Sequence, residues 1–180
     1  MNNKTLGILA LSLAAVSANA AISFSNISTP AGVTANVSGG SITFTASNFF
    51  FSAGAGLKTF GVSYTVTSSL GALTTAEISN PGLLKKAWFK AEIDHDGDLA
   101  DHTWSAAGSS AANLSPSLFV ALDDQSSYNV ELTISAQANA GGYVNAKNTN
   151  VAYNEAVPEP ASMAALALGF GLIAKRRNRK

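Results

Sequence analysis

The feature that most constrains the fold is a strict alternation of apolar and polar residues along several segments of the chain. In residues 128–136, Tyr, Val, Leu, Ile and Ala occupy every second position, and Asn, Glu, Thr and Ser occupy the positions between them. Successive side chains of a β-strand point to opposite faces of the sheet, so this spacing predicts a strand with one buried and one solvated face. Residues 41–46 and 61–67 repeat the pattern, and Phe89, Ala91 and Ile93 form another inward-facing set.

Further segments are predicted to be strands because they are rich in β-branched and aromatic residues: residues 22–27, 33–37, 73–78, 103–105, 118–122 and 143–153. Between the strands lie turn-forming clusters such as Gly39-Gly40, Asn80-Pro81-Gly82 and Gly141-Gly142. Eight or nine short strands without a convincing soluble helix indicate an all-β domain, a two-sheet antiparallel β-sandwich of the jelly-roll or immunoglobulin-like type.

Three groups of apolar residues allow predictions about which side chains are exposed. Three consecutive aromatics, Phe49 to Phe51, follow an alternating strand, so at least one is expected to face away from the core unless a bulge intervenes. An outward aromatic would form a platform for sugar stacking or surface adhesion; the alternative is a core strand end packed under a loop. Trp88 falls on the face assigned to solvent and is the candidate ligand-binding aromatic, with Trp104 as its expected neighbour. Residues 118–122 are interpreted as a run buried on both faces.

The C-terminal segment has three parts in a fixed order. Val157, Pro158, Glu159, Pro160, Ala161 and Ser162 precede an apolar run, residues 161–174, and a basic end, residues 175–180. As a helix the fourteen-residue run would span about 21 Å, short of the roughly 30 Å hydrocarbon core, and basic side chains that snorkel to the interface would narrow the gap. The basic end is expected to stay on the cytoplasmic side, which places the preceding domain outside. The prolines exclude a continuous helix through the junction.

This segment resembles the PEP-CTERM sorting signal of Gram-negative, exopolysaccharide-producing bacteria, which is the substrate signal of the membrane enzyme exosortase. Residues 157–162 match the motif region, the apolar run matches the membrane segment, and residues 175–180 match the basic end. The resemblance implies a transient intermediate in the inner membrane with a short transmembrane helix, processing near Pro-Glu-Pro by exosortase, and release or attachment at the cell surface or in the extracellular matrix.

The N-terminus carries the signature of a secretory signal peptide. Lys4 supplies a positive charge, residues 6–16 are apolar, and Ala18 and Ala20 occupy the −3 and −1 positions that signal peptidase accepts. We therefore expect residues 1–20 to be a helical signal peptide, residues 21–156 to be the exported domain, and residues 157–180 to be the sorting signal.

The charge balance of the exported part excludes several classes of function. Residues 21–157 contain five lysines, ten acidic residues and no arginine, which gives a net charge of −5. Non-specific nucleic-acid binding depends on clustered positive charge, so a nucleic-acid partner is not expected. The chain has no cysteine, which excludes thiol catalysis, thiolate metal sites and disulfides.

One acidic stretch, Asp94 to His102, contains side chains of the types that bind metal ions. Asp94, Asp96 and Asp98 lie at alternate positions beside Gly97, which is similar to the start of an EF-hand or dockerin calcium loop, and Asp101 is a further candidate ligand for Ca²⁺. The pattern then departs from the EF-hand, because Leu99 stands where glycine is usual and Ser105 where a bidentate acid is usual. Two alternatives remain: a hydrophilic hairpin loop between strands that end at Ile93 and begin near Thr103, and a transition-metal site at His95 and His102.

No motif of an enzyme active site occurs in the chain, so we do not expect catalysis and assign no catalytic residue or cofactor beyond the possible Ca²⁺. Two classes of function remain. The first is a non-enzymatic surface or extracellular-matrix protein that exosortase processes and that is associated with exopolysaccharide or biofilm. The alternative is a carbohydrate-binding module, with calcium as a possible aid.

Overall fold

A computed structural model describes residues 22–96, 102–114 and 117–156 of the 180-residue chain. The predicted signal helix with Ala18 and Ala20, the predicted transmembrane helix, residues 157–162 of the sorting signal, Asp98 and Asp101 lie outside the described residues. Among the residues that the structure does describe, no helix is long and apolar enough to span a bilayer.

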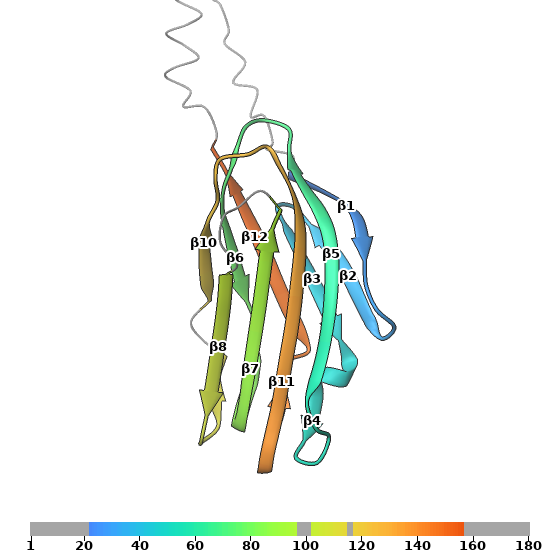
Figure 1. Cartoon of the computed structure of the whole chain (residues 1–180), viewed down its shortest axis with the longest axis vertical. Coiled ribbons are helices and arrows are strands. Elements are labelled where there is room, and N and C mark those ends of the chain that lie inside the picture. The colour runs from blue at the N-terminus through green and yellow to red at the C-terminus, as the bar shows by residue number, and fades with distance from the viewer. Residues whose placement is uncertain (1–21, 97–101, 115–116, 157–180) are drawn as a thin grey trace, which may run out of the picture.

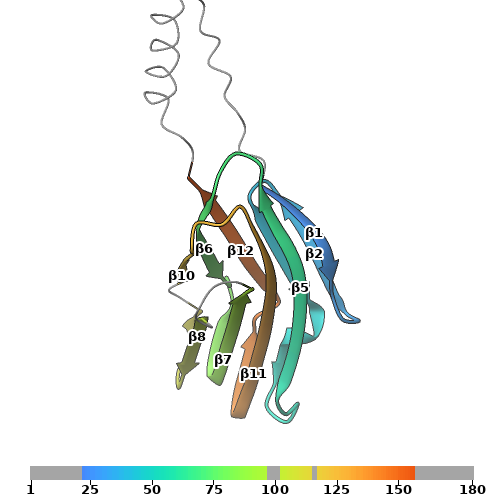
Figure 2. The ribbon, with the colours of Figure 1, turned by 45° about the horizontal axis from the view of Figure 1, so that its top comes forward.

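The described residues form two antiparallel sheets that pack face to face, as the sequence predicted (Figures 1 and 2). Sheet A has the order β1-β5-β11-β7-β8, and the short strands β4 and β9 pair with β11 and β7; its strands are β1 (Ile22–Ser28), β4 (Phe50–Ser52), β5 (Lys58–Ser68), β7 (Leu83–His95), β8 (His102–Gly108), β9 (Ala112–Asn113) and β11 (Ser127–Asn145). Sheet B has the order β10-β6-β12-β3-β2, with strands β2 (Val33–Ser38), β3 (Ser41–Ala46), β6 (Leu73–Ser79), β10 (Leu118–Ala121) and β12 (Asn148–Glu155). A 3-10 turn, η1 (Ser47–Phe49), leads into β4.

The core between the sheets consists of the apolar positions of the alternating strands. Sheet B contributes Ile42, Phe44 and Val151, which are fully buried, and sheet A contributes the inward positions of β5, β7 and β11: Val62, Tyr64, Val66, Phe89, Ala91, Ile93, Val130, Leu132 and Ile134. The alternation in the sequence placed each of these sheet A side chains on the inner face of its strand. The register adds that Leu132 lies opposite both Val62 and Ile93. Burial of these side chains supplies the main driving force for folding.

The long ribbon of β7 and β11 bends sharply near one end of the sandwich. The pairing shifts between Ala138 and Tyr143, where β11 has extra residues, and Lys86 on β7 and Gly141 on β11 have positive φ angles of 44° and 72°. Gly142 is packed so closely that an added Cβ would lie 2.4 Å from the carbonyl oxygen of Lys85. The turn predicted at Gly141-Gly142 is therefore a bulge within a continuous strand, and the predicted strand 143–153 is divided between β11 and β12.

Both ends of the described chain lie at the other end of the sandwich. Ile22 pairs with Ser68 on β5, and the hydroxyl of Ser68 donates a hydrogen bond to Glu155 Oε2. The backbone amide of Ala156 donates to the carbonyl of Ala72 at 2.8 Å, which ties the chain to the fold immediately before the proline-containing segment. The first strand begins at Ile22 and the last ends at Glu155, and the expected domain limits, residues 21 and 156, stay a prediction.

Two predictions about apolar residues were wrong. The run 118–122 is not buried on both faces, because β10 is an edge strand of sheet B and Phe119 lies on its outer face with 66% of its side chain exposed. Trp104 is not a neighbour of Trp88, because Trp104 pairs with Ala91 on the inner face and its ring packs against Phe89 at 5.3 Å, whereas Trp88 lies on the outer face. The prediction that one aromatic of Phe49 to Phe51 faces outward is confirmed: Phe50 is 60% exposed and the other two are buried.

Candidate functional site

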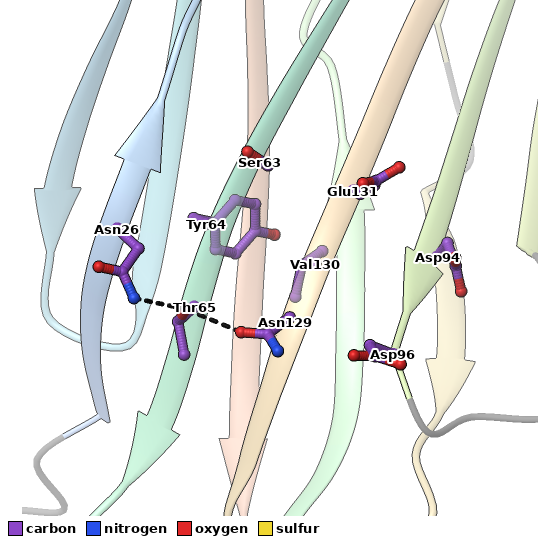
Figure 3. Close-up of a pocket in the computed structure, with 9 residues that line it drawn as sticks. All are labelled: Asn26, Ser63, Tyr64, Thr65, Asp94, Asp96, Asn129, Val130 and Glu131. Atoms are coloured by element: carbon purple, nitrogen blue, oxygen red, sulfur yellow. Dashed lines mark hydrogen bonds between the residues drawn. The ribbon is translucent and has the colours of Figure 1, made fainter.

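A hollow of about 420 Å³ lies on the outer face of sheet A, where β1, β5, β11 and β7 run side by side (Figure 3). It is lined by polar side chains at the outward positions of these strands: Asn26, Ser63, Thr65, Asp94, Asp96, Asn129 and Glu131. Tyr64 and Val130 also border the hollow, but their side chains are buried. The hollow therefore presents hydroxyl, amide and carboxylate groups to solvent.

The alternation that builds the core also places these groups together. The pairing of β5 with β11 sets Thr65 opposite Asn129 and Ser63 opposite Glu131, and the pairing of β11 with β7 sets Glu131 opposite Asp94. Each of these residues is next in sequence to a buried residue of its own strand. Since successive side chains of a strand point to opposite faces, all of them face outward.

A row of hydrogen bonds crosses the floor of the hollow from β1 to β11. Asn26 Nδ2 donates to Thr65 Oγ1 at 3.2 Å, and Thr65 Oγ1 donates to Asn129 Oδ1 at 3.0 Å, as the dashed lines in Figure 3 show. Asn26 reaches this position from an irregular point of β1, where its φ is 52° and the pairing with β5 shifts. The row fixes the orientation of both amides, which leaves Asn129 Nδ2 and Asn26 Oδ1 available for a ligand.

The acidic side of the hollow comes from β7 and the residue after it. Asp94 and Asp96 face outward beside Glu131, and the backbone amide of Asp96 donates to the carbonyl of Asn129 at 2.8 Å. Three carboxylates without a lysine in the lining favour ligands that donate hydrogen bonds or carry positive charge.

The strand β7 runs further than the sequence predicted, and this changes the interpretation of the acidic stretch. β7 continues to His95, so Asp94 and His95 lie in a strand and not in a loop that begins after Ile93. His95 has the same parity as Ile93 and is therefore fully buried between the sheets, where its Nε2 lies 3.1 Å from the hydroxyl of Tyr153. His102 lies at the start of β8, opposite Ile93. The side chain of His95 points into the core, and a transition-metal site at His95 and His102 stays a prediction.

The calcium prediction concerns four aspartates, of which Asp94 and Asp96 are described. Within residues 22–96, 102–114 and 117–156, no group of three or more His, Cys, Asp or Glu side chains is placed to hold a metal ion. Calcium binding that uses all four aspartates stays a prediction.

Trp88 lies on the same outer face as the hollow but at a distance from it. Trp88 is opposite Gln137, whereas Asp94 is opposite Glu131, so six residues of β11, or roughly 20 Å at about 3.3 Å per residue, separate the two positions. Its indole Nε1 donates to Gln137 Oε1 at 3.3 Å, and its ring is half-buried. Trp88 is thus outward-facing, as predicted, and is not part of the hollow.

Sequence reasoning identified Asp94 and Asp96 as site residues and missed the others in the hollow. Asn26, Ser63, Thr65, Asn129 and Glu131 were assigned to strands, and for most of them the outward face was clear. What was missing was the order of the strands, because alternation gives a side chain its face and does not name its neighbours across the sheet.

Solved structures with a similar arrangement of strands match this chain weakly. They include TmCBM61 in complex with beta-1,4-galactotriose (TM-score 0.32, 10% identity, covering 74% of this chain and 88% of that chain). A family 29 carbohydrate-binding module complexed with mannohexaose matches at a TM-score of 0.24 and 7% identity, covering 73% of this chain and 92% of that chain. These values are too low to transfer a ligand or an activity to this chain. No curated protein sequence matches it.

The sequence model of the PEP-CTERM protein-sorting motif matches residues 156–180, which include all of the residues identified as the sorting signal. The match begins at Ala156, the residue whose amide makes the bond to Ala72 at the end of β12. The motif implies recognition by exosortase and export to the surface of a Gram-negative cell. The C-terminal segment of this chain is thus a PEP-CTERM protein-sorting motif that directly follows a two-sheet β domain.

Proposed function

We propose that residues 21–156 are a non-enzymatic component of the cell surface or extracellular matrix, that exosortase delivers them there, and that they associate with exopolysaccharide or biofilm. The observation that carries this proposal is the direct junction between the sandwich and the sorting motif. The last described strand, β12, ends at Glu155, and the motif begins at the next residue, Ala156. Removal of the motif would leave both sheets intact, as a protein that works after processing requires.

Two properties of the domain support a role without catalysis. The outer faces carry rows of uncharged hydrogen-bonding side chains, such as Thr43 with Asn150 on sheet B at 2.9 Å and Thr59 with Ser135 on sheet A at 3.0 Å. Strongly shifted pKa values often mark catalytic groups. Here burial raises the pKa of Tyr64 and of Tyr153, and both side chains lie in the core, away from solvent.

The proposal is tested by following the full chain in the cells that make it, with and without exosortase. In wild-type cells we expect a product that has lost its C-terminal segment and that fractionates with the surface or matrix, and in exosortase-deficient cells we expect a full tail and membrane association. A variant with Pro158→Ala and Pro160→Ala serves as a control, because it should behave in wild-type cells as the normal chain does without exosortase. An uncut, membrane-bound chain in both strains would contradict the proposal.

A second candidate function is carbohydrate binding at the hollow on sheet A. The specific observation in its favour is the fixed row from Asn26 to Asn129 beside the carboxylates of Asp94 and Glu131, because amide and carboxylate groups bind sugar hydroxyls well. The exported protein should then be retained on a glycan array, and Asn129→Ala should weaken retention, whereas Asn154→Ala on the outer face of sheet B should not. Repeating the array with a chelator tests a contribution of calcium. No retention on any polysaccharide would exclude this function.

A further inference from the structure

The charged side chains of the domain are sorted along its long axis. Four of the five lysines in residues 22–156 lie around β4 and the bend of β7 and β11, and we call this group the lysine pole: Lys58, Lys85, Lys86 and Lys147. Lys58 Nζ donates to the carbonyl of Asn48 at 3.0 Å, Lys85 is opposite Tyr143, and Lys86 Nζ would be 3.8 Å from a Cβ at Gly141. The fifth lysine, Lys90, forms an ion pair with Glu92 on the outer face of sheet A.

Six of the eight acidic residues in the described part of the chain lie toward the other end, where the first strand begins and the last strand ends; Glu77 and Glu92 do not. The acidic pole consists of the five of these residues that are exposed: Asp94, Asp96, Asp123, Asp124 and Glu131. Asp94, Asp96 and Glu131 line the hollow, and Glu155 contacts Ser68. Asp123 and Asp124 precede two residues whose carbonyls bond the amides of Leu73 and Ser68, so they belong to the same end.

The two poles are too far apart to neutralise one another within one molecule. Ten residues of β11 separate Glu131 in the hollow from Gly141 beside Lys86, or roughly 30 Å at about 3.3 Å per residue. At physiological ionic strength the Debye length is about 8 Å, so each pole presents its charge to solvent and to other molecules. Figure 1 shows the separation: β4 and the bend of β11 lie at the bottom of the view, and the start of β1 and the end of β12 lie at the top.

We propose that the exported domain associates head to tail with a second copy of itself, the lysine pole of one copy docking against the acidic pole and hollow of the next. Both halves of this interface are present in one chain, and their charges are complementary. Contacts between two lysine poles or between two acidic poles are repulsive, so the charges disfavour contacts between like poles and favour contacts between opposite poles. A head-to-tail contact that does not close into a ring extends into a filament.

The shapes of the two poles are compatible with this contact. The hollow is concave and has no lysine in its lining, whereas the lysine pole presents Phe50, which is 60% exposed and has Lys147 Nζ 4.8 Å from its ring centre. Leu83, also exposed, lies across Asn145 from Phe50. An apolar ring with cationic side chains around it offers both burial and charge pairing to a hollow with carboxylates at its edge.

The sorting motif follows Glu155 at the end of the domain that carries the acidic pole. We therefore expect the self-association in the processed protein, from which the motif has been removed. This inference goes beyond the proposed function, because it names a partner for the domain and does not depend on glycan binding.

The test exchanges the charges of the two poles in the full chain and uses the exported product. One variant carries Lys85→Glu and Lys147→Glu, and a second carries Asp94→Lys and Glu131→Lys. All four side chains are exposed, and Asp94 and Glu131 already face each other as like charges, so neither change should disturb the fold. Glu77→Lys, on the outer face of sheet B, is a control for a change of net charge away from both poles. Circular dichroism checks that each variant is folded.

Sedimentation velocity over a range of protein concentrations is the measurement. We expect the wild-type protein and the Glu77→Lys control to form larger species at low salt and to dissociate at about 1 M salt, where the Debye length falls to about 3 Å. Each pole variant alone should remain monomeric, and an equimolar mixture of the two should associate again, because each supplies the charge that the other lacks. A wild-type protein that is monomeric at low salt would overturn the proposal, as would a folded pole variant that associates by itself or a mixture that stays monomeric.

Discussion

The hydroxyl groups of Tyr64 and Tyr153 lie 2.8 Å apart and form a buried hydrogen bond that joins the two sheets. Tyr64 belongs to β5 of sheet A, and Tyr153 belongs to β12 of sheet B. His95 on β7 lies within 3.1 Å of the same Tyr153 hydroxyl, so three strands meet at one polar point inside an apolar core. Tyr153, two residues before the end of β12, thus joins the final strand to sheet A.

Removal of the Tyr64 hydroxyl and removal of the Tyr153 hydroxyl should each lower the free energy of unfolding, but by different amounts. Tyr153 has two partners, Tyr64 and His95, whereas Tyr64 has Tyr153. Because a partner that stays buried without its hydrogen bond costs about 1 to 3 kcal/mol, we expect Tyr64→Phe to cost about 1 kcal/mol and Tyr153→Phe to cost more. Urea unfolding of the exported protein gives both values. Equal losses, or a larger loss for Tyr64→Phe, would show that His95 does not contribute.

The same pair predicts a loss of stability in alkali. Burial raises the pKa of Tyr64 and the pKa of Tyr153 above the ordinary value of about 10, since ionised tyrosine is poorly solvated in the core. Above pH 10 the unfolded chain therefore releases protons that the folded chain keeps. The stabilisation is fully present below about pH 10 and declines above it by up to about 1.4 kcal/mol per pH unit for each tyrosine. Urea midpoints measured between pH 9 and pH 12 should fall, and the fall should be shallower in Tyr64→Phe.

Phe49 and Phe50 provide a test of which aromatic in the triplet stabilises the fold. Phe49 is fully buried and packs edge-on against Phe60 with ring centres 4.7 Å apart, whereas Phe50 is 60% exposed. We expect Phe49→Ala to cost about 3 to 5 kcal/mol and Phe50→Ala less than about 1 kcal/mol. Thermal unfolding of the two variants measures the difference. Similar melting temperatures would place both rings on the surface.

The bend of β11 should not tolerate a side chain at Gly142. An added Cβ would lie 2.4 Å from the carbonyl oxygen of Lys85 and 2.5 Å from that of Lys86, and backbone atoms cannot move aside as a flexible side chain can. We expect Gly142→Ala to cost about 1 to 3 kcal/mol. Gly61→Ala is the matched control, because the nearest atom to its Cβ would be Thr133 Oγ1 at 3.8 Å. Urea unfolding should separate the two variants, and equal stabilities would contradict the geometry of the bend.

The sequence predicted the parts of this fold that depend on one strand at a time. The alternation in residues 128–136 and 61–67 gave the correct faces for Leu132, Val62 and Glu131 because burial of one face is a property of the strand itself. The pairing of β5, β11 and β7 depends on contacts between residues far apart in the chain, and periodicity carries no information on them. The hollow was missed for this reason.

Errors in the prediction occurred where strands end or lie at an edge. Asp94 and His95 belong to a stretch that is rich in turn-forming residues, yet the pairing with β11 continues the strand through both of them. Tertiary contacts here override the local preference. Phe119 belongs to an apolar run that periodicity could not place, and only its position on the edge strand β10 explains its exposure.

The hollow itself should be a source of electrostatic strain in the domain. Asp94 and Glu131 are directly opposite each other on neighbouring strands, and like charges in this arrangement destabilise a sheet by a few tenths of a kcal/mol. Replacing Glu131 by Gln keeps the shape and removes the repulsion, so the free energy of unfolding should rise at low salt. At high salt the gain should shrink, because screening already weakens the repulsion in the wild-type protein. Glu77→Gln, whose partners across the strands are Phe119 and Ala152, is the matched control and should change little. Urea unfolding at two salt concentrations measures both effects. A gain of stability that accompanies weaker self-association would mean that these carboxylates are maintained for binding at the expense of stability, whereas a loss of stability in Glu131→Gln would mean that Glu131 supports the fold.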